Sequence, residues 1–378
     1  MRDSHTRLEP FLNPLVIRRS AGPFRSGSAS GTAACVRFLR VILAVLLLCP
    51  TWSGEERLPL YRGIPTVRTR PVTLGPGNPQ RVGALTFLGG LQLLSGDPAF
   101  GGFSSMTVEG DRFTLLSDGG LIFGFRMASP MRPHDPWFGA LPAGPRTGWR
   151  KLDRDSESMV RDPATGRIWV GFERYNMIWR YAPGFARADG SAAPPAMRDW
   201  PLNSGAEAIV RLREGGFLVF SEGEKAPGGG KVVLRFLGDP VAAPRHGFAF
   251  AYLPPERYKP VDAAELPDGR LLVLNRRFTL GTGFVNKLTL VDTRGVKPGQ
   301  RVQGQVIAAL ESPLIHDNFE GMALTREGGA TIVWLVSDDN TSWFQRTLLL
   351  KFRLDLPIRE RPASREGSRP VSPRAKAD

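Results

Sequence analysis

The chain has 378 residues, of which 42% are hydrophobic, so it can bury a core in one large domain or two ordinary ones. The formal net charge is +14, a basic balance that suits anionic substrates or a cell-envelope surface. The basic residues are scattered, and no helix or aromatic platform gathers them, so we do not expect a nucleic-acid-binding protein.

The first 54 residues have the organisation of a secretory signal region. Arg37 and Arg40 precede an apolar run, 41–49, which small and polar residues follow. This run is too short to span a bilayer, which takes about twenty residues. We therefore expect a signal peptide region at 1–54, a periplasmic or secreted location, and no integral membrane span in the mature form. A buried core strand is the alternative.

The ends of the chain differ from its centre. Both cysteines, Cys35 and Cys49, lie in the predicted signal region, so the mature chain would lack a thiol for a disulfide, a cysteine nucleophile or a thiolate metal ligand. Residues 55–80 are Pro-rich without a clear period, and we expect an extended lead-in there. Residues 357–378 are rich in Pro, Ser and Arg, which predicts a disordered basic tail.

Between residues 81 and 356 the chain consists of short apolar runs separated by Gly, Asp or Pro. No long window keeps a helical period, and runs of this kind are typical of strands buried on both faces. The clearest runs are 113–117, 167–172, 217–220, 271–274 and 331–336.

One sequence motif recurs in this region: an acid, a small residue, an apolar residue, a tight Gly turn, an apolar strand and a second acid. Its apolar anchors step by 53, 50, 55 and 58 residues. A period near fifty residues, built on hairpins, is typical of a β-propeller. The anchors are Met106, Met159, Ile209, Ala264 and Met322.

Five copies of the motif are visible, and two predicted strands belong to none of them. One lies near Leu85 and the other at 347–352, and together they could form a sixth blade that closes the ring. We therefore predict a single all-β propeller of six blades over residues 81–356. The Pro/Gly-rich stretch 127–149 is expected to be a long loop.

The turns also predict which acids face each other. Opposed residues of an antiparallel pair have a constant index sum, which a hairpin turn fixes. The resulting pairs are Glu207 with Glu222, Glu157 within one residue of Glu173, and Asp262 with Asn275.

Like charges opposed at about 5 Å destabilise a sheet, so a repeated pair of acids needs a compensating cation. If the hairpins are the inner strands of the blades, these acids surround one mouth of the central channel. A ring of carboxylate and amide oxygens suits a hard cation, and we expect Ca²⁺. The alternative is that the acids bond backbone N–H groups or face solvent.

Basic side chains and one histidine lie beside these acids. Arg174, Lys225 and Arg276 follow the closing acid or amide of their copies, as expected for a site that holds a phosphate-like group. Solvated loop charges are the alternative. His316 precedes the fifth copy and is a candidate general base or ligand, or else an ordinary loop histidine.

The copies of the motif together resemble a known family, the phytase-like domain family, which is described as having esterase-like activity. The similarity extends over roughly residues 87–354. It implies a secreted or periplasmic propeller related to phosphomonoester hydrolases, with Ca²⁺-assisted hydrolysis. The segments on which the resemblance rests are GFSSM at 102–106, DSESM at 155–159, GAEAI at 205–209, DNFEGMA at 317–323 and VSDDN at 336–340.

The resemblance also implies roles for individual residues. Arg174 and Lys225, with Arg276 beside them, would hold the anion. Ser105 replaces an acid in the first copy and Asn275 in the fourth, which leaves the number of metals open. The implied metal ligands are Glu157, Glu173, Glu207, Glu222, Glu320 and Asp338, and the implied catalytic residues are Glu157, Glu207 and Glu320, joined by His316.

We therefore expect an exported hydrolase that acts as a monomer on a small anionic ester. Two other functions stay open. One is a non-catalytic envelope propeller that binds a ligand or a protein, and the other is a gluconolactonase-like lactone hydrolase.

Overall fold

The computed structural model describes residues 39–41, 43, 61, 65–203, 205–342 and 345–356. The predicted tail and almost all of the predicted signal region lie outside these residues. The chain divides into two units, Met1–Gly54 and Glu55–Asp378, and the fold below belongs to the second. None of the helices in the described part of the chain has the length and hydrophobicity of a membrane-spanning segment.

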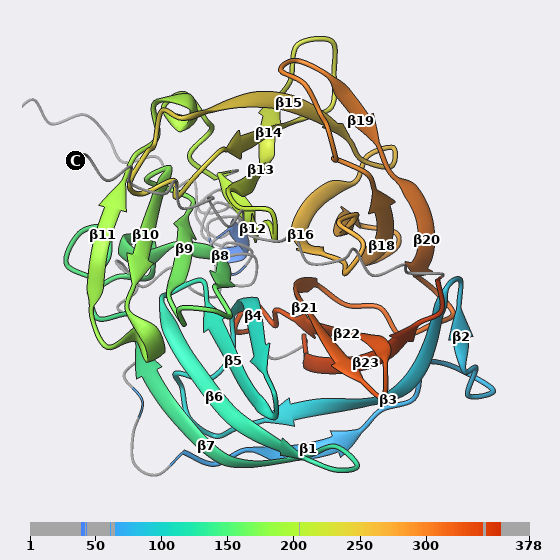
Figure 1. The fold of residues 1–378 in the computed structure, drawn as a ribbon. Coiled ribbons are helices and arrows are strands. Elements are labelled where there is room, and N and C mark those ends of the chain that lie inside the picture. The colour runs from blue at the N-terminus through green and yellow to red at the C-terminus, as the bar shows by residue number, and fades with distance from the viewer. Residues whose placement is uncertain are drawn as a thin grey trace, which may run out of the picture. The chain divides into compact units, whose positions relative to one another are not determined.

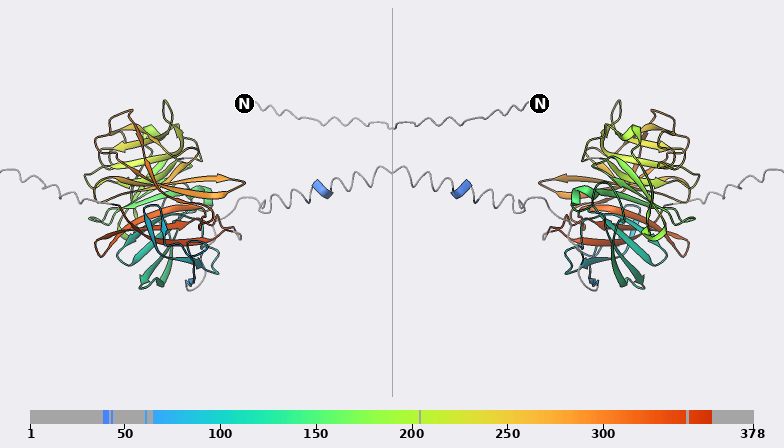
Figure 2. Two further views of the ribbon diagram at one scale, coloured as in Figure 1. Left: turned by 90° about the vertical axis from the view of Figure 1, so that its right-hand side faces the viewer. Right: turned by 90° about the vertical axis from the view of Figure 1, so that its left-hand side faces the viewer.

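The second unit is a β-propeller whose described strands form five sheets around a central axis (Figures 1 and 2). Blade I contains β4 (Phe103–Glu109), β5 (Arg112–Ser117), β6 (Leu121–Ala128) and β7 (Arg132–Ala140). Blade II contains β8 (Ser156–Arg161), β9 (Ile168–Phe172), β10 (Met177–Tyr181) and β11 (Ala188–Ala192). Blade III contains β12 (Ala206–Arg211), β13 (Phe217–Lys225), β14 (Lys231–Phe236), β15 (Gly247–Leu253) and β19 (Arg301–Gln303).

The other two blades complete the ring. Blade IV contains β16 (Lys259–Glu265), β17 (Leu271–Thr279), β18 (Gly283–Val291) and β20 (Gln305–Leu310). Blade V contains β21 (Phe319–Glu327), β22 (Ala330–Ser337), β23 (Thr347–Leu354), β3 (Leu85–Leu94) and β1 (Arg68–Pro71), with β2 (Arg81–Val82) beside β3. The short helices are α2 (Lys151–Arg154), η1 (Pro183–Phe185) and η2 (Pro195–Met197).

Five hydrophobic clusters fill the five seams between neighbouring blades. In the seam between blades IV and V, for example, Leu274 of β17 and Leu335 of β22 are fully buried. Another cluster joins blade V to blade I, so the ring is closed. Each fully buried leucine contributes roughly 1.5–3 kcal/mol to stability, and the seams therefore hold the blades together.

The all-β propeller is confirmed, but the prediction of six blades is wrong. The two unmatched strands do pair, as β3 with β23, yet both join the sheet of the fifth copy. The hairpin of β21 and β22 takes its outer strands from both ends of the fold, first β23 and then β3. Within the predicted lead-in, β1 also pairs with β3. The stretch 127–149 is not one long loop, because β7 forms the outer strand of blade I.

Candidate functional site

The first strand of each blade lines the central channel and contacts the first strand of the next blade around the ring. Each of these strands carries a β-bulge at the same level, which leaves one residue without a partner and re-aims its side chain. The bulge residues are Ser104, Glu157, Glu207, Val261 and Glu320.

These bulges make the predicted register wrong. Ala208 lies opposite Phe220, so Glu207 and Glu222 do not share a rung. Glu157 lies in its bulge between the pairs formed by Ser156 and Ser158, so it does not oppose Glu173 either. The extra residue changes the index sum partway along each hairpin, and the sequence gives no local sign of it.

The pair predicted in blade IV does not form. Asp262 lies opposite Leu274, and its carboxylate accepts hydrogen bonds from the backbone N–H of Met322 in blade V (2.6 Å) and of Ala263 (2.8 Å). Asn275 is buried and accepts a hydrogen bond from the hydroxyl of Tyr252 at 2.9 Å. Both residues join blade IV to its neighbours.

A second set of side chains comes from the ends of the second strands. In four blades the N–H of an acid donates to the carbonyl oxygen two residues before the bulge, at 2.8 to 3.4 Å. Three of these acids directly follow the second strand of their blade, and Glu222 lies within β13. In blade IV, Arg276 holds this position, opposite Lys259. The four acids are Asp118, Glu173, Glu222 and Asp338.

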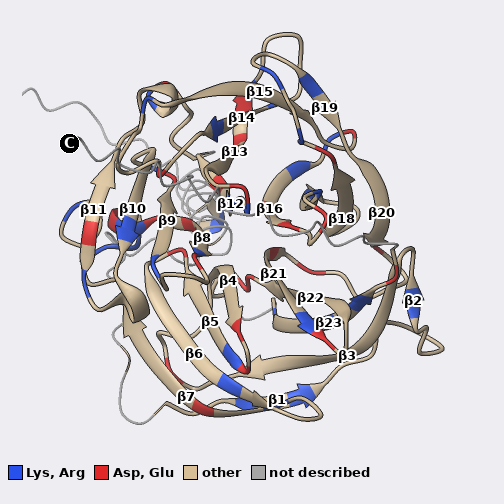
Figure 3. Ribbon diagram, viewed as in Figure 1, with Lys and Arg blue, Asp and Glu red and all other residues tan. Residues whose placement is uncertain are grey.

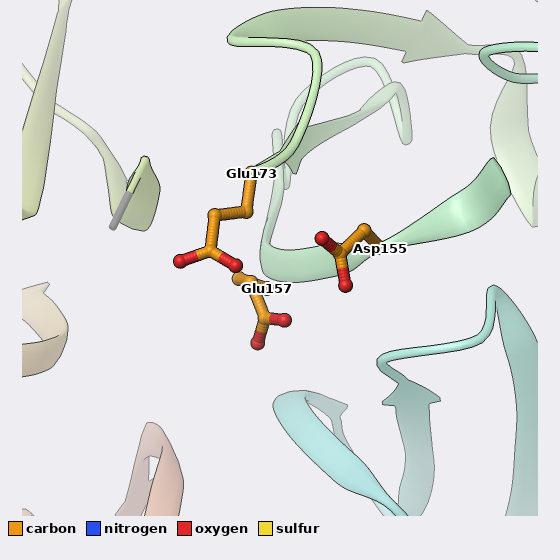
Figure 4. A group of neighbouring side chains, drawn as sticks. All are labelled: Asp155, Glu157 and Glu173. Atoms are coloured by element: carbon orange, nitrogen blue, oxygen red, sulfur yellow. The ribbon is translucent and has the colours of Figure 1, made fainter. Parts of the chain in front are cut away.

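The bulge glutamates and the strand-end acids meet at one end of the channel, which we call the acidic mouth. Acidic segments gather around the axis in Figure 3. Ligand oxygens of Asp155, Glu157 and Glu173 lie within 4.8 Å of one another, and Figure 4 shows the three side chains converging. The acidic mouth consists of Asp118, Asp155, Glu157, Glu173, Glu207, Glu222, Glu320 and Asp338.

Acids from different blades act on one another there. Burial raises the pKa of Glu157 well above its ordinary value, and the charges of Asp118 in blade I and Asp338 in blade V add to the effect. Burial likewise raises the pKa of Glu207, with further repulsion from Glu222 and Glu157. The convergence of side chains from distant parts of the chain is therefore a feature of the structure.

Two aspartates in the acidic mouth titrate near neutrality. Burial and the neighbouring charges of Glu173 and Asp118 raise the pKa of Asp155 to about 7. Burial and Asp118 raise the pKa of Asp338 to about 7 as well. Glu173 and Glu207 hydrogen-bond to each other, which requires that the pair share a proton.

Cations neutralise one part of the mouth. Arg276 ion-pairs with Glu222 at 3.0 Å and with Glu320, and Lys259 ion-pairs with Glu222 at 2.8 Å. Lys151 of α2 ion-pairs with Asp118. Burial lowers the pKa of Lys151, but attraction to Asp118 outweighs it and raises the pKa above its ordinary value.

The other part of the mouth lacks such partners. Among the described residues, Asp155, Glu157, Glu173 and Glu207 form no ion pair. Their oxygens could hold a cation. Nitrogen and sulfur ligands are absent from this group, so a hard ion such as Ca²⁺ suits it better than zinc.

The predicted basic residues and the histidine are placed differently. Arg276 lies inside the mouth, and Arg174 is close enough to lower the pKa of Asp155 in part. Lys225 is exposed at the end of β13, opposite Lys231. His316 faces the carbonyl oxygen of Leu314 at 2.7 Å and lines a separate surface pocket.

Sequence reasoning left four residues out of the site: Asp118, Asp155, Lys151 and Lys259. Asp118 ends the first copy of the motif, so its position in the repeat could have identified it as a site residue. Asp155 lies two residues before the first acid of its copy. Nothing in the local sequence of Lys151 or Lys259 shows that their long side chains reach acids of other segments.

The repeated apolar anchors lie further along the channel. They line a cavity of about 290 Å³ to which all five inner strands contribute. Charged residues, among them Arg161, Arg211 and Glu265, share the lining of this cavity. The anchors are Met106, Met159, Ile209, Ala264 and Met322.

The model of the phytase-like family, described as "Esterase-like activity of phytase", matches residues 98–341, more than half of the chain. The chain belongs to the phytase-like family. The match includes all eight acids of the acidic mouth, and it places this phytase-like domain among hydrolase-like propellers. No curated protein matches the chain.

Similar solved structures are distant. The major allergen Mala s 1 of Malassezia sympodialis shares 11% identity over 77% of this chain and 96% of that chain, with a TM-score of 0.39. Hydrazine synthase of Kuenenia stuttgartiensis shares 12% identity over 63% of this chain and 77% of that chain, with a TM-score of 0.35. Likenesses at this level say nothing about the site of the phytase-like domain.

Proposed function

We propose that this chain is an exported hydrolase that uses Ca²⁺ to cleave phosphomonoesters or small esters in the acidic mouth. The observation that carries the proposal is the group of carboxylates, Asp155, Glu157, Glu173 and Glu207, that converge without an ion-pair partner among the described residues. Membership of the phytase-like family supports hydrolysis in general terms. Export rests on the predicted signal region.

The carboxylate group fits a calcium ion. Ca²⁺ binds oxygen ligands at about 2.3–2.6 Å, so ligands on opposite sides of one ion lie up to about 5 Å apart. The oxygens of Asp155, Glu157 and Glu173 lie within 4.8 Å of one another. When bound, the ion would neutralise an oxygen of the ester and lower the pKa of an attacking water.

The other residues of the mouth have separate tasks. Arg276 and Lys259 place positive charge beside the carboxylates, where it can attract the anionic part of a substrate. Asp338, with a pKa of about 7, can accept a proton from water near neutral pH. Lys151 holds the carboxylate of Asp118, which limits repulsion within the mouth.

The test is an assay of purified protein on generic phosphomonoesters, carboxylic esters and lactones, with and without a chelator. We expect turnover of a phosphomonoester or a carboxylic ester that the chelator abolishes and Ca²⁺ restores. Glu157→Gln should abolish it too. Glu327→Gln is the matched control, because Glu327 lies on an inner strand but ion-pairs with Lys351 at the other end of the blade.

The outcomes separate the alternatives. Chelator-sensitive turnover of lactones alone would favour a lactone hydrolase. A metal-dependent rise in melting temperature without any turnover would favour a non-catalytic binding propeller. Turnover that is indifferent to both the chelator and Glu157→Gln would refute the proposed site.

A further inference from the structure

A buried tyrosine between blades III and IV has an unsatisfied hydroxyl group. Tyr258 follows β15, immediately precedes β16, and is 3% exposed. Its hydroxyl is buried and has no hydrogen-bond partner among the described residues. A buried polar group without a partner costs about 1–3 kcal/mol, so such a group calls for an explanation.

Two cations lie over the ring of this tyrosine. The guanidinium carbon of Arg277 and the ammonium nitrogen of Lys287 are each 4.9 Å from the ring centroid. The Nε of Arg277 is itself buried and has no hydrogen-bond partner among the described residues. Two unsatisfied donors and a second positive charge therefore meet around one ring.

The strand register shows that both cations come from the same face of the sheet. Arg277 lies two residues after Asn275 on β17, and Lys287 of β18 lies directly opposite Asn275. Residues two apart on a strand share a face, and so do directly opposed residues. Asn275 contacts Tyr252 of blade III, so this face looks into the seam between blades III and IV.

Neither cation has an acidic partner in the part of the chain that the structure describes. Within the described chain, Arg277 and Lys287 form no ion pair. The neighbouring Arg276 differs: it points to the opposite face and ion-pairs with Glu222 and Glu320. The exposed Glu311 acts on Tyr258 only through its charge at longer range.

We propose that Tyr258, Arg277 and Lys287 form a binding site for a small oxyanion, a phosphate or a carboxylate group. The oxygens of such a group accept hydrogen bonds from the Tyr258 hydroxyl and from Nε of Arg277, and its charge offsets the repulsion between the two cations. A tyrosine hydroxyl is protonated at neutral pH, and burial raises the pKa of Tyr258 further above its ordinary value, so the hydroxyl remains a donor. The site does not depend on a metal or on hydrolysis.

The test is titration calorimetry on the full chain in a chelator, with inorganic phosphate and acetate in separate experiments. We expect saturable binding of at least one anion, and the tighter of the two assigns the ligand class. Arg277→Gln and Lys287→Gln should each weaken binding at least about tenfold, since each removes a charged partner. Lys297→Gln, an exposed lysine outside the seam, is the matched control and should leave the affinity unchanged.

Tyr258→Phe separates binding from folding. It removes a hydroxyl that has no partner, so the melting temperature without anion should stay the same or rise. The rise in melting temperature on adding the anion should shrink. Glu157→Gln should keep the anion affinity, so failure of the proposed hydrolase leaves this test intact. If neither anion binds, or if Arg277→Gln and Lys287→Gln bind like the wild type, the proposal is overturned.

Discussion

Removal of divalent metal should make the stability of this protein fall as the pH rises from about 4 to about 7. Asp155 and Asp338 have an ordinary pKa of 3.8 and a pKa of about 7 in the folded protein. Between these values the folded state binds more protons than the unfolded state. Deprotonation therefore favours unfolding, and the loss is complete once the pH exceeds about 7.

The size of the effect follows from the same values. A shift of roughly three units corresponds to about 4 kcal/mol for one group that titrates alone. The acids interact, so we take about 4 kcal/mol for the pair rather than for each member. For a domain of this size that amounts to roughly 10 °C in melting temperature. Glu157 and Glu207, whose pKa values are also raised, act in the same direction.

Acids with a lowered pKa affect stability in a different pH range. Several aspartates outside the acidic mouth have a lowered pKa in the folded protein, so their stabilisation is lost only as the pH falls below about 4. These are Asp153, Asp162, Asp268, Asp292 and Asp355.

Scanning calorimetry of metal-free protein across this range gives the measurement, and the same series with saturating Ca²⁺ is the control. Calcium should remove the downward slope, because it stabilises the ionised carboxylates. A metal-free protein that is equally stable or more stable at the alkaline end would refute the reasoning.

Three further predictions concern single substitutions. By calorimetry, Glu157→Gln should raise the melting temperature of the metal-free protein and remove most of the rise in melting temperature that Ca²⁺ causes. The control Glu327→Gln should change neither quantity. A metal-free melting temperature below that of the wild type for Glu157→Gln would contradict the prediction. Arg276→Gln removes the cation that pairs with Glu222 and Glu320, so the metal-free protein should melt lower and Ca²⁺ should stabilise it more than the wild type; an unchanged calcium response would count against this. Leu274→Ala should cost about 2–5 kcal/mol in urea unfolding, and less than about 1 kcal/mol would mean that the seam does not hold the blades.

The sequence revealed the features of this fold that depend on neighbouring residues. Each inner hairpin has its own glycine turn and apolar strand, so five copies were visible. The number of blades depends on where β3 pairs, and its partner β23 lies at the far end of the chain. Such a pairing leaves no local pattern, and the count of six was wrong.

In the candidate site, too, the sequence predicted what depends on neighbouring residues and missed what depends on contacts between distant segments. The bulge glutamates Glu157, Glu207 and Glu320 stand out in the repeat, and the structure brings them to one end of the channel. The one-residue bulges and the reach of Lys151, Lys259 and Arg276 depend on contacts between separate segments. Sequence reasoning therefore found six of the eight acids of the acidic mouth, but not how they oppose one another or which cations pair with them.

Blade V is built from both ends of the folded domain, and this fixes the order in which the ring can form. Thr86 hydrogen-bonds to Asp355, which is 269 residues away. During synthesis β3 can pair with β1 and β2 early, but its other edge has to wait until β23 has been made. Four blades can assemble one after another behind the ribosome or a translocation pore, but the circle closes only at the end, and trimming either terminus opens the same blade.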